Sequence, residues 1–189
     1  MPRLNPFNPS EATGERQELF SAVQQKMGKV PNLLQTMGQS PAVLESYLSF
    51  SGALGKASLS ADVRERIALV VGEANKCEYC LAAHTAIGRS VGLDDAAILE
   101  SRQGSASDPK IDAILAFSSE LVEKRGWVSD ASVAQLREVG LGDGEIAEVV
   151  ATVALNTFTN YNNVSMFYFY LECSNFRAFL RSSYRDGGS

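Results

Sequence analysis

The chain has 189 residues, of which 45% are hydrophobic and 21% are charged, and its formal net charge is −5 at pH 7. This size and apolar content favour one domain with a substantial core. The sequence has no long block of Lys and Arg, so we do not expect nucleic acid as a partner. No segment reaches transmembrane length and residues 1–10 lack a signal-peptide pattern, so we expect no membrane partner and a cytoplasmic location.

Gly and Pro residues divide the chain into pieces of helical length, and no stretch shows the sustained two-residue alternation of a strand. The sequence therefore predicts an all-α fold, a single-domain helical bundle covering residues 1–189. Ser60 and Ser129 can cap helix N-termini, and Gly28 suits a C-terminal turn. The expected helices are Gly14–Met27, Pro31–Met37, Pro41–Leu54, Ser60–Ala74, Cys77–Val91, Asp94–Ser101, Pro109–Lys124, Ser129–Val139 and Asp143–Val164.

The segment from residue 60 to residue 92 holds the C-x-x-C pair Cys77 and Cys80 and the only histidine of the chain, His84. On a helix that begins near Cys77, these spacings put both thiols and the imidazole on one face. A thiolate can attack a peroxide, and the sulfenic acid that forms can condense with a neighbouring thiol to give a disulfide. His84 is the one imidazole that can accept the thiol proton.

The order of attack is open at this point, because two effects favour different cysteines. The positive end of the helix dipole favours ionisation of Cys77. The four-residue spacing instead favours proton transfer from Cys80 to His84.

A carboxylate is needed to orient the imidazole, and the helix expected before the cysteines offers Glu65 and Glu73. Glu65 projects between apolar residues on one face, whereas Glu73 projects on a polar edge where a solvated acid is ordinary. A carboxylate on an apolar face is costly unless it is paired. We therefore expect Glu65 to hydrogen-bond His84, with a surface pair between Glu65 and an arginine as the alternative.

Together these residues resemble the alkylhydroperoxidase D-like branch of the carboxymuconolactone decarboxylase superfamily. The resemblance rests on Glu65, on Cys77 to Cys80 twelve to fifteen residues later, on His84 and on the flanking segments 64–69 and 73–75. Looser similarity at Val30 to Leu33, Ser40 to Ala42 and Asn156 to Tyr161 extends it over about residues 30–164. The C-terminal tail, residues 166–189, lies outside it.

The resemblance implies an all-helical fold, self-association into a trimer or hexamer and an antioxidant enzyme that reduces hydrogen peroxide or organic hydroperoxides. It implies that Cys80 is the peroxidatic cysteine, that Cys77 resolves the intermediate and that His84 and Glu65 relay the proton. It also implies an unidentified dithiol reductant as a partner, and no cofactor or metal. Well-studied relatives have a histidine at the position of Tyr79, so activation here should depend on His84.

Several other interpretations of these residues are kept. Cys77, Cys80 and His84 could bind zinc together with Cys173, although Cys173 is more simply a buried apolar side chain. A helical redox sensor could use the same cysteine pair without turnover. Asn156, Asn160 and Asn163 form an amide stripe that could line a peroxide pocket, form a subunit contact or satisfy helix crossings. The aromatic run 167–170 predicts burial within the domain or between subunits.

Overall fold

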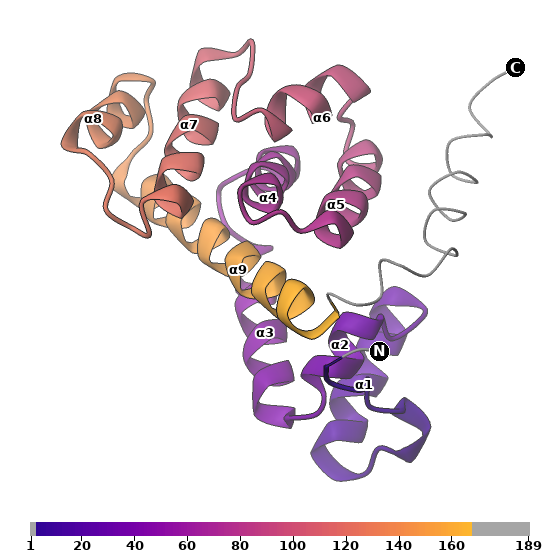
Figure 1. The fold of residues 1–189 in the computed structure, drawn as a ribbon. Coiled ribbons are helices and arrows are strands. Elements are labelled where there is room, and N and C mark those ends of the chain that lie inside the picture. Colours follow the sequence, from indigo (N-terminus) through magenta and orange to yellow (C-terminus); the bar gives the residue numbers. More distant parts are fainter. Residues whose placement is uncertain (1–2, 168–189) are drawn as a thin grey trace, which may run out of the picture.

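A computed structural model describes residues 3–167, in which every regular element is helical, and this confirms the predicted all-α class (Figure 1). A short 3-10 helix, η1 (Pro9–Glu11), precedes the α-helices. These are α1 (Gly14–Met27), α2 (Asn32–Met37), α3 (Pro41–Leu54), α4 (Ala61–Ala74), α5 (Glu78–Ser90), α6 (Asp95–Arg102), α7 (Pro109–Glu123), α8 (Asp130–Glu138) and α9 (Asp143–Phe167).

The helix ends follow local capping chemistry, and several differ by one to three residues from the predicted bounds. The largest difference is in α9, which runs to Phe167 instead of Val164. Gly28 adopts the left-handed conformation at the end of α1, and the Ser129 hydroxyl accepts from the Ser132 N–H at 3.2 Å. Ser60 precedes α4 but makes no side-chain cap. Cys77 lies just before α5 instead of within it, because its φ of −93° and ψ of 86° are not helical.

Helix α4 lies at the centre of the fold, with α5, α6 and α7 around it and the long helix α9 along one side (Figure 1). All six residues from Ile67 to Gly72 are buried, as expected for a helix with apolar residues on all sides. Ile67 and Val71 belong to the main core with α7, α8 and α9, whereas Leu69 packs in a separate cluster with Leu81 and Ile98. Because α4 packs against both clusters, the residues at its C-terminus are held in place by the core.

Helices α1 to α3 gather at the other side of α9 around a cluster that includes Phe20, Met37 and Leu44 (Figure 1). At the N-terminus, the Arg3 N–H donates to the Met166 carbonyl at 2.9 Å, which ties this end of the chain to the end of α9. Among the described helices, none has the length and apolar character to cross a bilayer. The assignment of residues 1–189 to one domain stays a prediction.

The Glu148 carboxylate fastens α9 to the loop before α4. It accepts from the Ser58 N–H at 3.0 Å, the Ser58 hydroxyl at 2.7 Å and the Leu59 N–H at 3.0 Å. These hydrogen bonds, led by the one from the Ser58 backbone, lower the pKa of Glu148 from its ordinary value. A lowered pKa means that the ionised carboxylate stabilises the folded state.

We expect Glu148→Gln to lower the thermal unfolding midpoint at pH 7, because the amide replaces one acceptor oxygen by a donor. The stabilisation by Glu148 is present above the unfolded-state pKa of about 4.3 and is lost as the pH falls through the lower folded-state value. The two midpoints should therefore converge in acid. Glu138→Gln, at an exposed glutamate of α8, is the control. Equal midpoints of Glu148→Gln and the wild type at pH 7 would refute this role.

Candidate active site

The turn that leads into the cysteine pair is fixed by the backbone. The Cys77 N–H donates to the Gly72 carbonyl at 2.9 Å, and the Lys76 N–H donates to the Glu73 carbonyl at 3.0 Å. These two bonds form a Schellman motif that ends α4. Its left-handed position is occupied by Lys76, with φ of 53°, where glycine is usual. A non-glycine residue in this region stores strain, of order 1 kcal/mol or more, directly beside Cys77.

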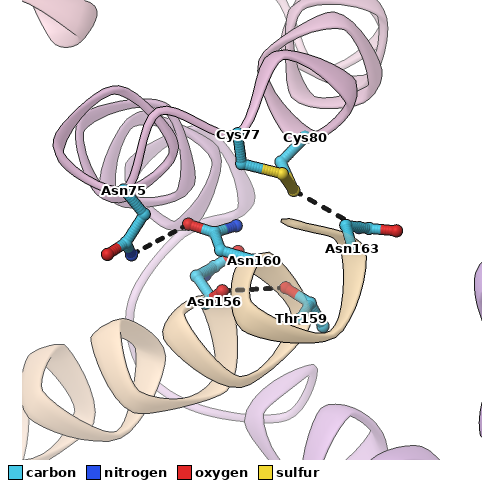
Figure 2. The surroundings of a disulfide bond; sticks show 7 residues. All are labelled: Asn75, Cys77, Cys80, Asn156, Thr159, Asn160 and Asn163. Atoms are coloured by element: carbon cyan, nitrogen blue, oxygen red, sulfur yellow. Dashed lines mark hydrogen bonds between the residues drawn. A yellow bond between two sulfur atoms is a disulfide. The ribbon is translucent and has the colours of Figure 1, made fainter. Parts of the chain in front are cut away.

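Cys77 and Cys80 are joined by a disulfide, with their Cα atoms 5.3 Å apart (Figure 2). Cys77 is 2% exposed and Cys80 is 3% exposed, so both residues are buried. Cys77 is the N-cap of α5 and Cys80 lies in its first turn. The two sulfurs can therefore pass between a dithiol and a disulfide at the end of a helix without a long rearrangement of the chain.

His84 and Glu65 form a pair that joins α5 to α4. The His84 Nδ1 atom lies 2.7 Å from the Glu65 Oε2 atom, and the two side chains are 21% and 18% exposed. An ionised carboxylate only accepts hydrogen bonds, so it selects the imidazole form that carries a proton on Nδ1. In the neutral imidazole, the lone pair then lies on the Nε2 atom. Because His84 follows Cys80 by four residues on α5, the imidazole lies on the helix face of Cys80.

Glu73, the other acid considered from the sequence, lies elsewhere. Its carboxylate accepts from the Arg102 Nε atom at 2.8 Å, and the two side chains are 45% and 41% exposed. The alternative pairing of Glu65 with an arginine is not observed among the described interactions, since Glu65 bonds His84. Helical projection therefore separated the two acids correctly, although the catalytic role of Glu65 stays a prediction.

Two tyrosines flank the site, and the sequence analysis missed the first. Burial raises the pKa of Tyr47, a residue of α3, and the charge of Glu65 raises it further, while a hydrogen bond with Ser51 opposes the shift. Partial burial also raises the pKa of Tyr79, which is 39% exposed and immediately precedes Cys80. Both side chains are therefore neutral phenols at pH 7. Tyr47 precedes Glu65 by about twenty residues in the chain, and no local sequence motif indicated that it interacts with this site.

Buried amides of α9 cover the other side of the disulfide (Figure 2). The Asn163 Nδ2 atom lies 3.3 Å from the Cys80 sulfur, and the Asn160 Oδ1 atom accepts from Asn75 Nδ2 at 3.1 Å. Asn156 bonds the Thr152 carbonyl within α9 at 2.9 Å. The amide stripe predicted from the sequence therefore has different partners along its length, and only its last member contacts a sulfur in the disulfide form.

The zinc interpretation includes Cys173 and is therefore not tested by the part of the chain that the structure describes. No group of three His, Cys, Asp or Glu side chains there is arranged to hold a metal ion. Cys77 and Cys80 are bonded to each other, and a disulfide sulfur is not the thiolate ligand that zinc requires. Cys173 and the side chains of the aromatic run 167–170 lie outside the described residues.

Comparison with known proteins gives a family match over the segment that holds the site. Residues 41–124 match the model of the carboxymuconolactone decarboxylase family. This segment runs from the first residue of α3 to the end of α7 and includes all four predicted site residues, which are Glu65, Cys77, Cys80 and His84. No match was found among curated protein sequences.

Solved structures with the same fold include two peroxidase-related proteins. An uncharacterized peroxidase-related protein from Silicibacter sp. TM1040 is 26% identical, with 86% of this chain and 89% of that chain covered and a TM-score of 0.73. The alkylhydroperoxidase AhpD core protein from Ralstonia eutropha JMP134, also peroxidase-related and uncharacterized, is 24% identical, with 87% and 90% covered and a TM-score of 0.77.

A third similar structure is a debrominase. Bmp8, in complex with 2,3,4-tribromopyrrole, is 18% identical, with 86% of this chain and 88% of that chain covered and a TM-score of 0.73. At this identity the likeness concerns the fold alone. The helical scaffold is thus found both in a debrominase and in uncharacterized peroxidase-related proteins, and the activity of this chain has to be argued from its own side chains.

Proposed function

We propose that this chain, whose residues 41–124 match the carboxymuconolactone decarboxylase family, is an alkylhydroperoxidase D-like enzyme that reduces hydroperoxides with Cys77 and Cys80. The observation that carries the proposal is the disulfide between these cysteines, one helical turn from an imidazole that is bonded to a carboxylate. This arrangement supplies a nucleophile, a resolving thiol and a base with an orienting acid. Those are the groups that a two-cysteine peroxidase requires.

In the first step, the reduced Cys80 thiol gives its proton to His84, and the thiolate attacks the terminal oxygen of the hydroperoxide. The S–O bond forms while the O–O bond breaks, so the sulfur is oxidised to sulfenic acid and the peroxide is reduced. The departing alkoxide, or hydroxide from hydrogen peroxide, takes the proton from His84 and leaves as alcohol or water. Glu65 stabilises the imidazolium that exists between the two transfers.

In the second step, the sulfur of Cys77 attacks the sulfur of the Cys80 sulfenic acid. The S–S bond forms and the S–O bond breaks, and the hydroxide leaves as water with the proton of the Cys77 thiol. The Cα separation of 5.3 Å is within the range of protein disulfides, so the pair closes without large backbone movement. The cycle then needs a dithiol, which reduces the protein disulfide and becomes a disulfide itself.

The remaining parts of the proposal concern the surroundings of the enzyme. A cytoplasmic location fits a cycle that depends on a dithiol donor, because that compartment keeps thiols reduced. We further propose a homo-oligomer, a trimer or hexamer, with no nucleic-acid or membrane partner. Light scattering of the purified protein measures this oligomeric state.

Peroxide consumption by the purified protein tests the function. With dithiothreitol or dihydrolipoamide as the donor, we expect hydrogen peroxide, cumene hydroperoxide or both to be consumed in large molar excess over the protein. The matched control omits the donor, and it should stop after one equivalent of peroxide. Oxidation of the pair without turnover under any donor would reject the enzyme and favour the alternative of a redox sensor built on the same disulfide.

A further inference from the structure

The amide of Asn163 approaches the sulfur of Cys80 from the facing helix α9. The Nδ2 to Sγ distance is 3.3 Å, and 83 residues separate the two positions in the chain. A disulfide sulfur is a weak hydrogen-bond acceptor, whereas an anionic acceptor makes a shorter and stronger bond with the same donor. The contact would therefore gain strength when the pair is reduced and Cys80 ionises.

A second amide lies beside the pair with an unused donor. Asn160 is fully buried, and its Nδ2 atom has no hydrogen-bond partner among the described residues. Its oxygen accepts from Asn75 at 3.1 Å, which fixes the orientation of the amide group. In Figure 2 the oxygen is turned toward Asn75 and the nitrogen is turned away from it, below the disulfide in this view.

We propose that Asn163 and Asn160 form an anion-binding pair for the reduced site. Asn163 donates a hydrogen bond to the Cys80 thiolate, and the Asn160 Nδ2 atom supplies a second donor for the same anion. This inference rests on the proposed function for the identity of Cys80 as the attacking cysteine. A buried donor without a partner is costly, and this donor would gain an acceptor when the disulfide is replaced by an anion. The amides would also hold the anionic oxygen of a deprotonated sulfenic acid.

Helix α9 carries no charged side chain after Glu148 that could stabilise the Cys80 anion. Around the pair, α5 carries His84 and Tyr79, α4 carries Glu65, and Tyr47 of α3 interacts electrostatically with Glu65 and Tyr79. Helix α6 faces α5 with Asp95, which pairs with Arg89 at the far end of that helix. The buried polar side chains of α9 near the pair are neutral amides and a threonine hydroxyl (Figure 2). A neutral N–H donor stabilises an anion without adding a charge of its own.

The test is the pH dependence of Cys80 alkylation in the reduced full-length protein. Iodoacetamide is neutral and reacts with the thiolate, and mass spectrometry of the peptides follows Cys80 separately from Cys77 and Cys173. We expect Asn163→Ala to move the midpoint of the Cys80 profile upward by about one to two pH units, as expected for the loss of a hydrogen bond to a charged group. Asn163→Asp, which removes the donor and adds negative charge, should move it at least as far.

Asn156→Ala is the matched control, because this buried amide of the same helix bonds the Thr152 carbonyl and no sulfur. It should leave the midpoint unchanged, and circular dichroism checks the folding of every variant. A second measurement uses the wild type alone: side-chain amide NMR signals of Asn160 and Asn163 should shift when reduced Cys80 is titrated. An unchanged midpoint in both Asn163 variants, or unshifted amide signals, would overturn the proposal. Neither readout needs peroxide turnover, so failure here is distinct from failure of the proposed function.

Discussion

Replacement of Cys80 by serine is expected to reduce dithiol-dependent peroxide consumption to the rate of buffer alone. The serine hydroxyl is close in size to the thiol but is not ionised near neutral pH, so the nucleophile is lost while the helix is kept. The measurement is initial rates of peroxide loss with saturating donor, together with circular dichroism to verify folding. This is the largest effect that the proposed mechanism requires.

Cys77→Ser is the matched variant, because it removes the other half of the same disulfide. It should still reduce one equivalent of peroxide and then accumulate oxidised Cys80, which the sulfenic-acid reagent dimedone labels. Cys173→Ser should retain turnover. If Cys80→Ser kept the wild-type rate, Cys80 would not be the attacking residue, and full turnover by Cys77→Ser would remove Cys77 from the resolving step.

The second large effect is expected at the proton relay. His84→Asn should lower kcat/KM by ~10²- to 10⁴-fold, the usual contribution of a general acid and base. Glu65→Gln should also lower it, by a smaller factor, because the imidazole remains but loses the carboxylate that orients it at 2.7 Å. The rates should be compared across pH, since loss of the base would make activity follow ionisation of the thiol alone.

Glu73→Gln is the control for Glu65→Gln. It removes a carboxylate of the same helix that bonds Arg102 near the surface and has no contact with His84 among the described interactions. The rate and pH profile of Glu73→Gln should match those of the wild type. Equal losses in both glutamine variants would point to damage of α4 and would contradict a specific role for Glu65.

Helix positions and the choice between the two acids could be predicted because both depend on local geometry. Periodicity and capping residues fix where a helix runs, and Gly28 ends α1 in the left-handed conformation that glycine favours. Helical projection separates Glu65 from Glu73 because residues on one helix have fixed relative directions. The break between α4 and α5 at residues 75 and 76 was also predicted. The left-handed conformation of Lys76 was not, because a lysine does not signal a left-handed residue.

Contacts between distant helices could not be predicted from these patterns. The sequence revealed the amide stripe of α9, but only the packing of α9 against α5 brings Asn163 to Cys80. Tyr47 carries no motif, and its electrostatic interaction with Glu65 becomes apparent only in the fold. Such pairings depend on which faces of separate helices meet. A single sequence shows which face of a helix is apolar, but it does not show which other helix packs against that face.

A single turnover of the fully reduced protein with one equivalent of hydroperoxide under argon tests the two-cysteine mechanism directly. Peptide mass spectrometry then identifies the product. The two-cysteine mechanism predicts complete loss of the peroxide, loss of two thiols per peroxide and a new Cys77–Cys80 disulfide, with Cys173 still reduced. Persistence of the peroxide beside an intact dithiol, or oxidation confined to Cys173, would contradict it.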